Sequence, residues 1–249
     1  MKPVGVLGGM GPAATILFME RVLGAVDAQD DADHIPRLVD QNTQVPSRIE
    51  AILGSGVGDP GRALAEMGQR LERAGAAALV MPCNTAHHYA AQVREAVSIP
   101  FLSMVDLALD HAARLAPGGA LGLLGSPALA RAGVFNAPAA ARGLALLELR
   151  DPAATLESIK TIKSRGVTPE ARAQIGREAQ ALAQAGARSI CVSCSEFSLV
   201  ARDLRAPVPV FDALDLLVDA TVRFARGEER LSVNAASAAP NLDREKETT

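Results

Sequence analysis

Aromatic residues and blocks of like charge are both scarce in this sequence of 249 residues. It has no tryptophan, one tyrosine and six phenylalanines, and its charged residues are interspersed, with a formal net charge of −3. Proteins that bind nucleic acid typically combine basic patches that neutralise phosphates with aromatic side chains that stack on bases. Nucleic acid is therefore not an expected partner.

Long apolar segments and paired cysteines are also missing. Although 49% of the residues are hydrophobic, no run approaches the ~18 apolar residues that indicate a membrane helix. Pro3, Gly8, Gly9, Gly11 and Pro12 interrupt the first fifteen residues, which therefore lack the apolar core of a signal peptide. The three cysteines are an odd number, unsuited to a secreted disulfide framework. We expect a cytoplasmic protein with reduced thiols, no membrane contact and a substantial core.

Short apolar runs alternate with helical patterns along the chain. The run Val4 to Leu7 ends in a glycine-rich turn, and a helical pattern then extends from Ala13 to Val26. A second helical pattern covers Arg62 to Ala74, and a buried strand is predicted over Ala78 to Met81. This alternation predicts an α/β fold with mostly parallel sheets flanked by helices.

The two halves of the chain repeat the same landmarks in the same order. Ala74-Gly-Ala returns as Ala185-Gly-Ala, and Cys83 returns as Cys194, each pair being 111 positions apart. Two further segments also repeat: Gly5-Val-Leu-Gly resembles Gly122-Leu-Leu-Gly, and the stretch from Ile99 to Asp106 resembles that from Val208 to Asp215.

The repeat predicts two pseudo-symmetric domains with an active site in the cleft between them. We expect one domain over residues 1–104, joined by a helix over 213–226, and the other over residues 105–211. From position 227 to 249 the sequence is polar and without periodicity. Such a composition buries too little apolar surface to fold, so a disordered tail is expected.

Cys83 and Cys194 follow equivalent predicted strands. Ligands collect at the carboxyl ends of parallel strands, so a pseudo-twofold axis would bring the two thiols to opposite sides of one small molecule. That arrangement suits stereoinversion, in which a thiolate removes the α-hydrogen and a thiol delivers a proton to the other face. Asn84, Thr85 and Ser195 are candidate donors to the developing enediolate.

Other interpretations of these residues stay open at this point. Cys191 and Cys194 have the spacing of a zinc or redox motif, but no second ligand pair accompanies them, and a packing role for Cys191 is the stronger prediction. His87 or His88 can instead serve as the base of a Cys–His nucleophile. The turn from Gly8 to Pro12 lacks the dinucleotide fingerprint and is assigned to a substrate carboxylate or to a plain turn. No metal and no cofactor are expected.

Taken together, these motifs resemble the aspartate/glutamate racemase family, and within it the aspartate racemase branch, over residues 1–226. The segments that carry the resemblance are Gly5-Val-Leu-Gly-Gly-Met-Gly-Pro12, Gln44-Val-Pro-Ser-Arg48, Met81-Pro-Cys-Asn-Thr-Ala-His87, Ile99-Pro-Phe-Leu-Ser-Met104 and the box around Cys194.

This resemblance implies racemisation of an acidic amino acid without pyridoxal phosphate, in a protein that is frequently a homodimer. It implies that Cys83 and Cys194 are the catalytic thiols. It places substrate contacts at Met10, Gly11, Gln44, Arg48, Asn84, Thr85, Lys163 and Ser195, with Lys160 as the alternative to Lys163.

The second cysteine box departs from the family pattern. The family usually has Gly-Cys-Thr-Glu where this chain has Ser193-Cys-Ser-Glu196, which makes the fold a firmer expectation than the substrate. Aspartate is the first expectation, followed by glutamate or another amino acid. A related diacid isomerase or decarboxylase and a non-catalytic amino-acid-binding protein are the alternatives.

Overall fold

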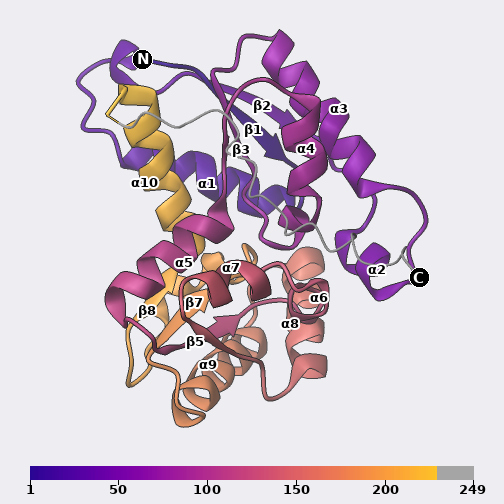
Figure 1. The fold of residues 1–249 in the computed structure, drawn as a ribbon, viewed down its shortest axis with the longest axis vertical. Coiled ribbons are helices and arrows are strands. Elements are labelled where there is room, and N and C mark those ends of the chain that lie inside the picture. The colour runs from indigo at the N-terminus through magenta and orange to yellow at the C-terminus, as the bar shows by residue number, and fades with distance from the viewer. Residues whose placement is uncertain (229–249) are drawn as a thin grey trace, which may run out of the picture.

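The computed structural model describes residues 1–228 and contains two parallel sheets of four strands each. The strand orders are β2-β1-β3-β4 in the first sheet and β6-β5-β7-β8 in the second, so the second sheet repeats the topology of the first. Figure 1 shows the two sheets in separate halves of the molecule, each flanked by its own helices. The predicted α/β fold with two similar halves is confirmed.

The first sheet and its helices occupy the amino-terminal part of the chain. The elements are β1 (Val4–Gly8), α1 (Pro12–Gly24), the 3-10 turn η1 (Asp31–Asp33), β2 (Arg37–Gln41), α2 (Arg48–Leu53), α3 (Pro60–Arg73), β3 (Ala78–Val80), the 3-10 turn η2 (Thr85–Tyr89), α4 (Ala90–Ala96) and β4 (Phe101–Leu102).

The second part of the chain begins with the helix that joins the halves and then forms the second sheet. Its elements are α5 (Met104–Leu115), β5 (Ala120–Leu124), α6 (Pro127–Ala132), α7 (Asn136–Ala141), β6 (Ala145–Leu147), α8 (Pro152–Arg165), α9 (Pro169–Gln184), β7 (Ser189–Val192), the 3-10 turns η3 (Phe197–Leu199) and η4 (Ala201–Asp203), β8 (Val210–Asp212) and α10 (Ala213–Arg226).

Local sequence explains where the first helices begin. Pro12 and Pro60 stand in the first turn of α1 and α3, where the missing N–H of proline has no helical partner to lose. Asp59 caps α3 by accepting hydrogen bonds from the backbone N–H groups of Gly61 and Arg62. Both helices therefore start within two residues of the positions predicted from periodicity.

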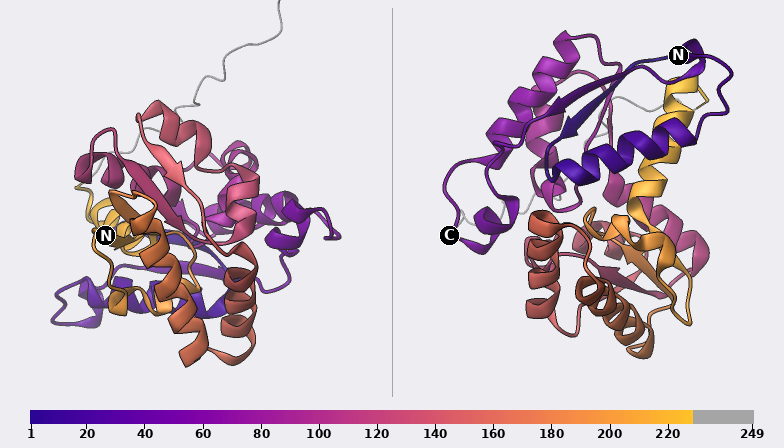
Figure 2. Two further views of the ribbon diagram at one scale, coloured as in Figure 1. Left: turned by 90° about the horizontal axis from the view of Figure 1, so that it is seen from below. Right: turned by 180° about the vertical axis from the view of Figure 1, so that it is seen from behind.

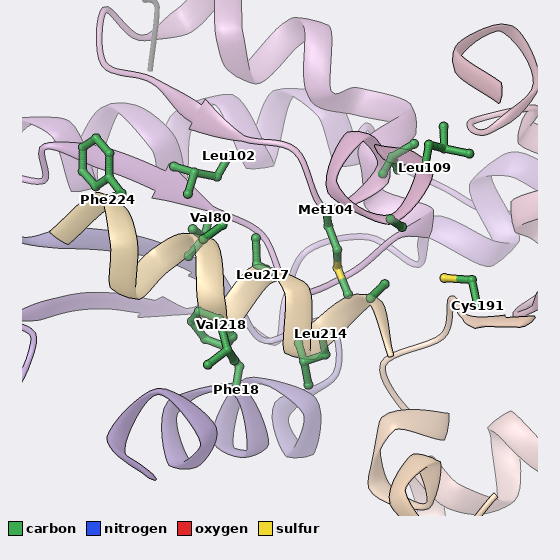
Figure 3. Packing of buried hydrophobic residues seen from close by; sticks show 14 of the residues in the cluster. Phe18, Val80, Leu102, Met104, Leu109, Cys191, Leu214, Leu217, Val218 and Phe224 are labelled. Carbon is green, nitrogen blue, oxygen red and sulfur yellow. The ribbon is translucent and has the colours of Figure 1, made fainter. Parts of the chain in front are cut away.

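Helix α10 returns to the amino-terminal half and packs against α1 and α5 (Figure 2). Figure 3 shows Leu214, Leu217 and Val218 of α10 in the same apolar cluster as Phe18 of α1 and Val80 of β3. Because this cluster continues to the second sheet through Cys191, one core spans both halves. The proposed boundary near residue 104 remains a prediction.

Two further expectations concern the ends and surface of the chain. The expected tail over 227–249 lies, apart from its first two residues, outside the described residues. Within residues 1–228, no helix has both the length and the apolar character required to cross a bilayer.

Candidate active site

Most of the predicted site residues lie in loops at the carboxyl ends of strands. Met10 and Gly11 follow β1, Asn84 follows β3, and Ser195 follows β7. These three strands are central or adjacent to the centre of their sheets, where parallel α/β proteins bind ligands. Lys163 differs, because it belongs to the last turn of α8.

The loop after β1 requires glycine at a defined position. Gly9 has a φ of +90°, and a β-carbon there would collide with the backbone of Asn42. Its N–H donates to Thr15 Oγ1 at 2.9 Å, which ties the loop to the first turn of α1. Gly11 then precedes α1 without a side-chain cap, so the N–H groups at this helix start remain available to an anion.

Cys83 lies in a buried loop beside an amide with unused hydrogen-bonding capacity. The residue is 8% exposed, and Asn84 is 1% exposed. Neither Oδ1 nor Nδ2 of Asn84 has a hydrogen-bond partner among the described residues. Since a buried amide without partners costs free energy, Asn84 is suited to a polar ligand that supplies them. Thr85 is buried next to it.

Cys194 has a charged hydrogen-bond partner that was not predicted from the sequence. Its Sγ donates to Glu196 Oε2 at 3.1 Å, and Glu196 Oε1 lies 3.5 Å from Lys163 Nζ. Burial raises the pKa of the Cys194 thiol well above its ordinary value, and the Glu196 carboxylate adds to this shift. The protonated thiol is therefore the favoured form of Cys194 in this structure.

The Met10–Gly11 turn is related to both cysteine boxes. Met10 belongs to the same buried apolar cluster as Cys83. On the other side, a β-carbon on Gly11 would lie 3.2 Å from Glu196 Oε1. Helix α6 of the second half contacts η2 and α2 of the first, so the two halves also meet at the segment that follows Cys83 and Asn84. The structure thus connects Gly11 with Cys194 through Glu196, and places Met10 in the apolar cluster of Cys83.

Lys163, rather than Lys160, reaches the second cysteine box. Lys160 is exposed and pairs with Glu157 at 2.7 Å, while Lys163 pairs with Glu196. Of the two lysines that the sequence left open, Lys163 is therefore the one beside Cys194, and its contact with substrate remains a prediction.

The side chains of Arg48 and Gln44 make their hydrogen bonds within their own loop. Arg48 Nη1 donates to the backbone carbonyls of Val45 and Pro46, and its Nε is buried without a partner among the described residues. Gln44 is exposed, and its amide donates to Thr43 Oγ1 at 3.3 Å. Within residues 1–228, the hydrogen bonds of Gln44 go to Asn42 and Thr43 and not to either cysteine box.

His87 and Cys191 have surroundings that favour structural roles. His87 is buried, and burial lowers its pKa from 6.5 to about 4. Its Nδ1 lies 2.9 Å from the backbone carbonyl of Cys83 and its Nε2 accepts the Met104 N–H, so neither nitrogen is free to act as a base. Cys191 is fully buried in β7 within the shared core, which agrees with the predicted packing role.

Sequence reasoning assigned no role to Glu196. The signal was present, because Glu196 follows Cys194 by two residues at the end of the recognised box. The sequence alone does not determine the side-chain rotamer of Glu196. In the structure this rotamer directs the carboxylate toward the Cys194 thiol and toward Lys163, 33 positions earlier.

Comparison with known proteins relates this chain to amino-acid racemases. A protein-family model described as Asp/Glu/Hydantoin racemase matches residues 7–221. The aspartate racemase of Picrophilus torridus has a solved structure similar to this one, with a TM-score of 0.80 and 26% identity over 93% of this chain and 96% of that one.

Two curated racemases are also similar in sequence to this chain. The glutamate racemase of Deinococcus radiodurans is 26% identical over 233 residues, which cover 90% of this chain and 72% of that protein. The broad specificity amino-acid racemase RacX of Bacillus subtilis is 28% identical over 107 residues, which cover 41% of this chain and 46% of RacX, less than half of that relative.

The family model covers most of the chain, and the solved structure of an aspartate racemase shares its fold. The chain therefore belongs to the Asp/Glu/hydantoin racemase family, which places it among the isomerases. The family resemblance predicted from the motifs is confirmed.

Proposed function

We propose that this protein racemises an acidic amino acid, with aspartate as the first candidate, by a two-thiol mechanism that needs no cofactor. The observation that carries the proposal is the position of the Met10–Gly11 turn, where Met10 shares a buried apolar cluster with Cys83 and Gly11 approaches Glu196, the partner of Cys194. A substrate held at this turn would have one thiol on each side of its α-carbon.

The proton balance of the reaction requires the two thiols in opposite states. The thiolate takes the α-hydrogen as a proton, and the thiol gives its own proton to the opposite face of the planar intermediate. After turnover the two cysteines have exchanged states, which prepares the protein for the other enantiomer. The raised pKa of Cys194 assigns the thiol to that residue before substrate binds.

The substrate's α-carboxylate is assigned to donors from both halves. The start of α1 after Gly11 offers backbone N–H groups, and the Asn84 amide has hydrogen-bonding capacity that no described residue uses. Thr85 and Ser195 add hydroxyl groups beside the two cysteines. Fixed donors of this kind stabilise the charge that develops on the carboxylate when the α-hydrogen leaves.

The distal carboxylate is assigned to Arg48 and Lys163, with Gln44 at the margin. Lys163 pairs with Glu196, and Arg48 has no carboxylate partner among the described residues. Aspartate and glutamate both carry a second carboxylate, which these two cationic side chains would bind. Arg48 would exchange its bonds to two backbone carbonyls for a bidentate bond to the substrate.

The proposal also includes the oligomeric state and the compartment: the protein is a homodimer and is cytoplasmic. The family resemblance supports it, and α1 supplies apolar surface for a contact through Ile16 and Leu23, which are 58% and 47% exposed. Light scattering on the purified chain tests the mass, and a monomer at micromolar concentration would remove the dimer from the proposal.

Proton NMR of L-aspartate in D₂O tests the reaction on reduced protein without added cofactor. The α-proton signal should disappear while D-aspartate accumulates on chiral analysis. Cys83→Ser and Cys194→Ser should each lower the rate by at least about 10²-fold. Cys191→Ala is the matched control, because this thiol is buried in the core away from the turn, and it should racemise at nearly the wild-type rate.

A panel of amino acids and of maleate, measured in the same way, covers the alternatives. Faster exchange of glutamate or of neutral amino acids would change the substrate, which the partial likeness to the broad specificity racemase RacX makes worth measuring. Turnover of maleate alone would favour a diacid isomerase. Binding of an amino acid without exchange of its α-proton would exclude racemisation and leave an amino-acid-binding protein.

A further inference from the structure

The fourth residue after Cys83 connects the cysteine loop to the start of a helix. His87 Nδ1 lies 2.9 Å from the carbonyl oxygen of Cys83, and the backbone N–H of Met104 donates to Nε2 at 3.0 Å. Because Met104 N is a donor, Nε2 must carry the lone pair, and the proton is on Nδ1. His87 therefore donates to the Cys83 carbonyl and accepts from the first residue of α5.

The fourth residue after Cys194 makes the corresponding connection in the second half. Ser198 N–H donates to the carbonyl of Cys194 at 3.2 Å, and Ser198 Oγ donates to Asp212 Oδ1 at 2.8 Å. Asp212 is the N-cap of α10, and the same carboxylate accepts the Leu214 N–H. A different side chain thus joins the second cysteine loop to the start of the equivalent helix.

Arg21 of α1 strengthens the connection in the second half. Its Nη1 lies 2.6 Å from Asp212 Oδ2, and its Nη2 donates to the Ser198 carbonyl at 2.6 Å. All three residues are buried, so these charge-assisted bonds are shielded from water and salt. The first half of the molecule therefore helps to hold the cysteine loop of the second.

The two helices that receive these connections pack against each other. Helices α5 and α10 are in contact, and Met104 shares its apolar cluster with Leu214 and Leu217. Figure 3 shows the Met104 side chain beside these two leucines. Each cysteine loop is thus fixed to one member of a helix pair that lies in the core common to both halves.

We propose that His87 and Ser198 are positioning residues, each of which fixes its own cysteine loop to the start of α5 or α10 and so sets where the two thiols lie relative to each other. The proposal rests on the two-thiol reaction, in which both sulfurs must reach one α-carbon from opposite faces. A displacement of about 1 Å at such a centre can cost about 10²-fold in rate, so a fixed separation between the thiols has catalytic value.

Neither residue is assigned to proton transfer. Both ring nitrogens of His87 are occupied by backbone partners, and its pKa near 4 keeps the ring neutral at physiological pH. The Ser198 hydroxyl is directed to Asp212. The role follows from the hydrogen bonds alone and predicts that each residue affects its own thiol and not the other.

The test is the alkylation rate of each cysteine by iodoacetamide in the full chain, read by peptide mass spectrometry. His87→Ala should change the rate at Cys83 by at least about fivefold and leave Cys194 within about twofold, because the reaction rate of a thiol follows its environment. Ser198→Ala should do the reverse. His88→Ala is the matched control, since His88 is the exposed neighbour of His87 and should change neither rate.

His87→Gln is a second variant in case removal of the ring prevents folding. Its amide oxygen can still accept the Met104 N–H but no longer reaches the Cys83 carbonyl, so the selective change at Cys83 should persist in a folded protein. For aspartate turnover, both Ala variants should lower kcat by about tenfold with KM within about twofold, because binding groups remain while the thiols are displaced.

The outcomes separate this proposal from the proposed function. Changes of both thiols together in each variant, or of neither, would overturn the positioning roles. Absence of racemisation in the wild-type protein would overturn the two-thiol reaction, whereas the alkylation rates would still report whether each residue fixes its own loop.

Discussion

Glu196 lies between Cys194 and Lys163, with one carboxylate oxygen 3.1 Å from the sulfur and the other 3.5 Å from the ammonium nitrogen. Burial is the main cause of the raised pKa of Cys194, the carboxylate raises it further, and the lysine acts in the opposite direction. The protonation state of this thiol is therefore linked to a charge pair that also borders the Gly11 turn.

Glu196→Gln should lower the pKa of Cys194, because the negative charge that disfavours the thiolate is removed. Burial persists, so the pKa should remain above the ordinary value of a thiol. The pH dependence of Cys194 alkylation measures this directly, and the basic limb of the kcat/KM profile should move to lower pH. Glu157→Gln, an exposed carboxylate paired with Lys160, is the control. An unchanged titration of Cys194 would contradict the role of Glu196.

Lys163→Ala should raise the KM for aspartate about tenfold, because a charge-assisted hydrogen bond contributes about 1.5–3 kcal/mol. Lys160→Ala should leave KM unchanged, since Lys160 is exposed and pairs with Glu157. Steady-state kinetics on both variants measure the difference. Equal effects from the two lysines would show that the distal carboxylate is not bound by Lys163 alone.

His87→Gln should make the protein less sensitive to acid. Burial holds the pKa of His87 at about 4 against 6.5 when exposed, so the unfolded chain takes up a proton first as the pH falls. The stability that depends on neutral His87 is complete above pH 6.5 and is lost between 6.5 and 4, on the order of 3 kcal/mol. Urea unfolding at pH 7 and at pH 4.5 measures the loss, which should be smaller in the variant. His88→Gln, at an exposed site, should show the wild-type loss.

The sequence predicted those features that depend on local pattern. Strand β1 and helix α1 follow from an apolar run, a glycine turn and Pro12, and the 111-residue repeat correctly indicated two similar α/β halves. Both cysteines could be placed after equivalent strands because a residue directly after a buried strand has little freedom of position.

Long side chains could not be placed in the same way. Arg48, Gln44 and Lys163 have several rotatable bonds, and their directions depend on neighbours that come together only in the fold. Arg48 folds onto its own loop, Gln44 turns to Thr43, and Lys163 meets a carboxylate from a loop 33 positions later. The pairing of Arg21 with Asp212 across 191 positions has no local signal at all.

A comparison of Gly9 with Gly75 measures how much the tight turn after β1 contributes to the free energy of unfolding. Both have positive φ, +90° and +98°, so alanine at either position incurs the cost of a left-handed conformation, about 1 kcal/mol. A β-carbon at Gly75 would meet no atom within 4 Å, whereas one at Gly9 would collide with the Asn42 backbone. Gly9→Ala should therefore destabilise the protein by about 2 kcal/mol more than Gly75→Ala in urea unfolding. Because Gly9 precedes the Met10–Gly11 turn, Gly9→Ala should also lower kcat/KM for aspartate, while Gly75→Ala should leave it unchanged. Equal stability of the two variants would mean that the close approach to Asn42 relaxes at little cost and that the turn is not held by it.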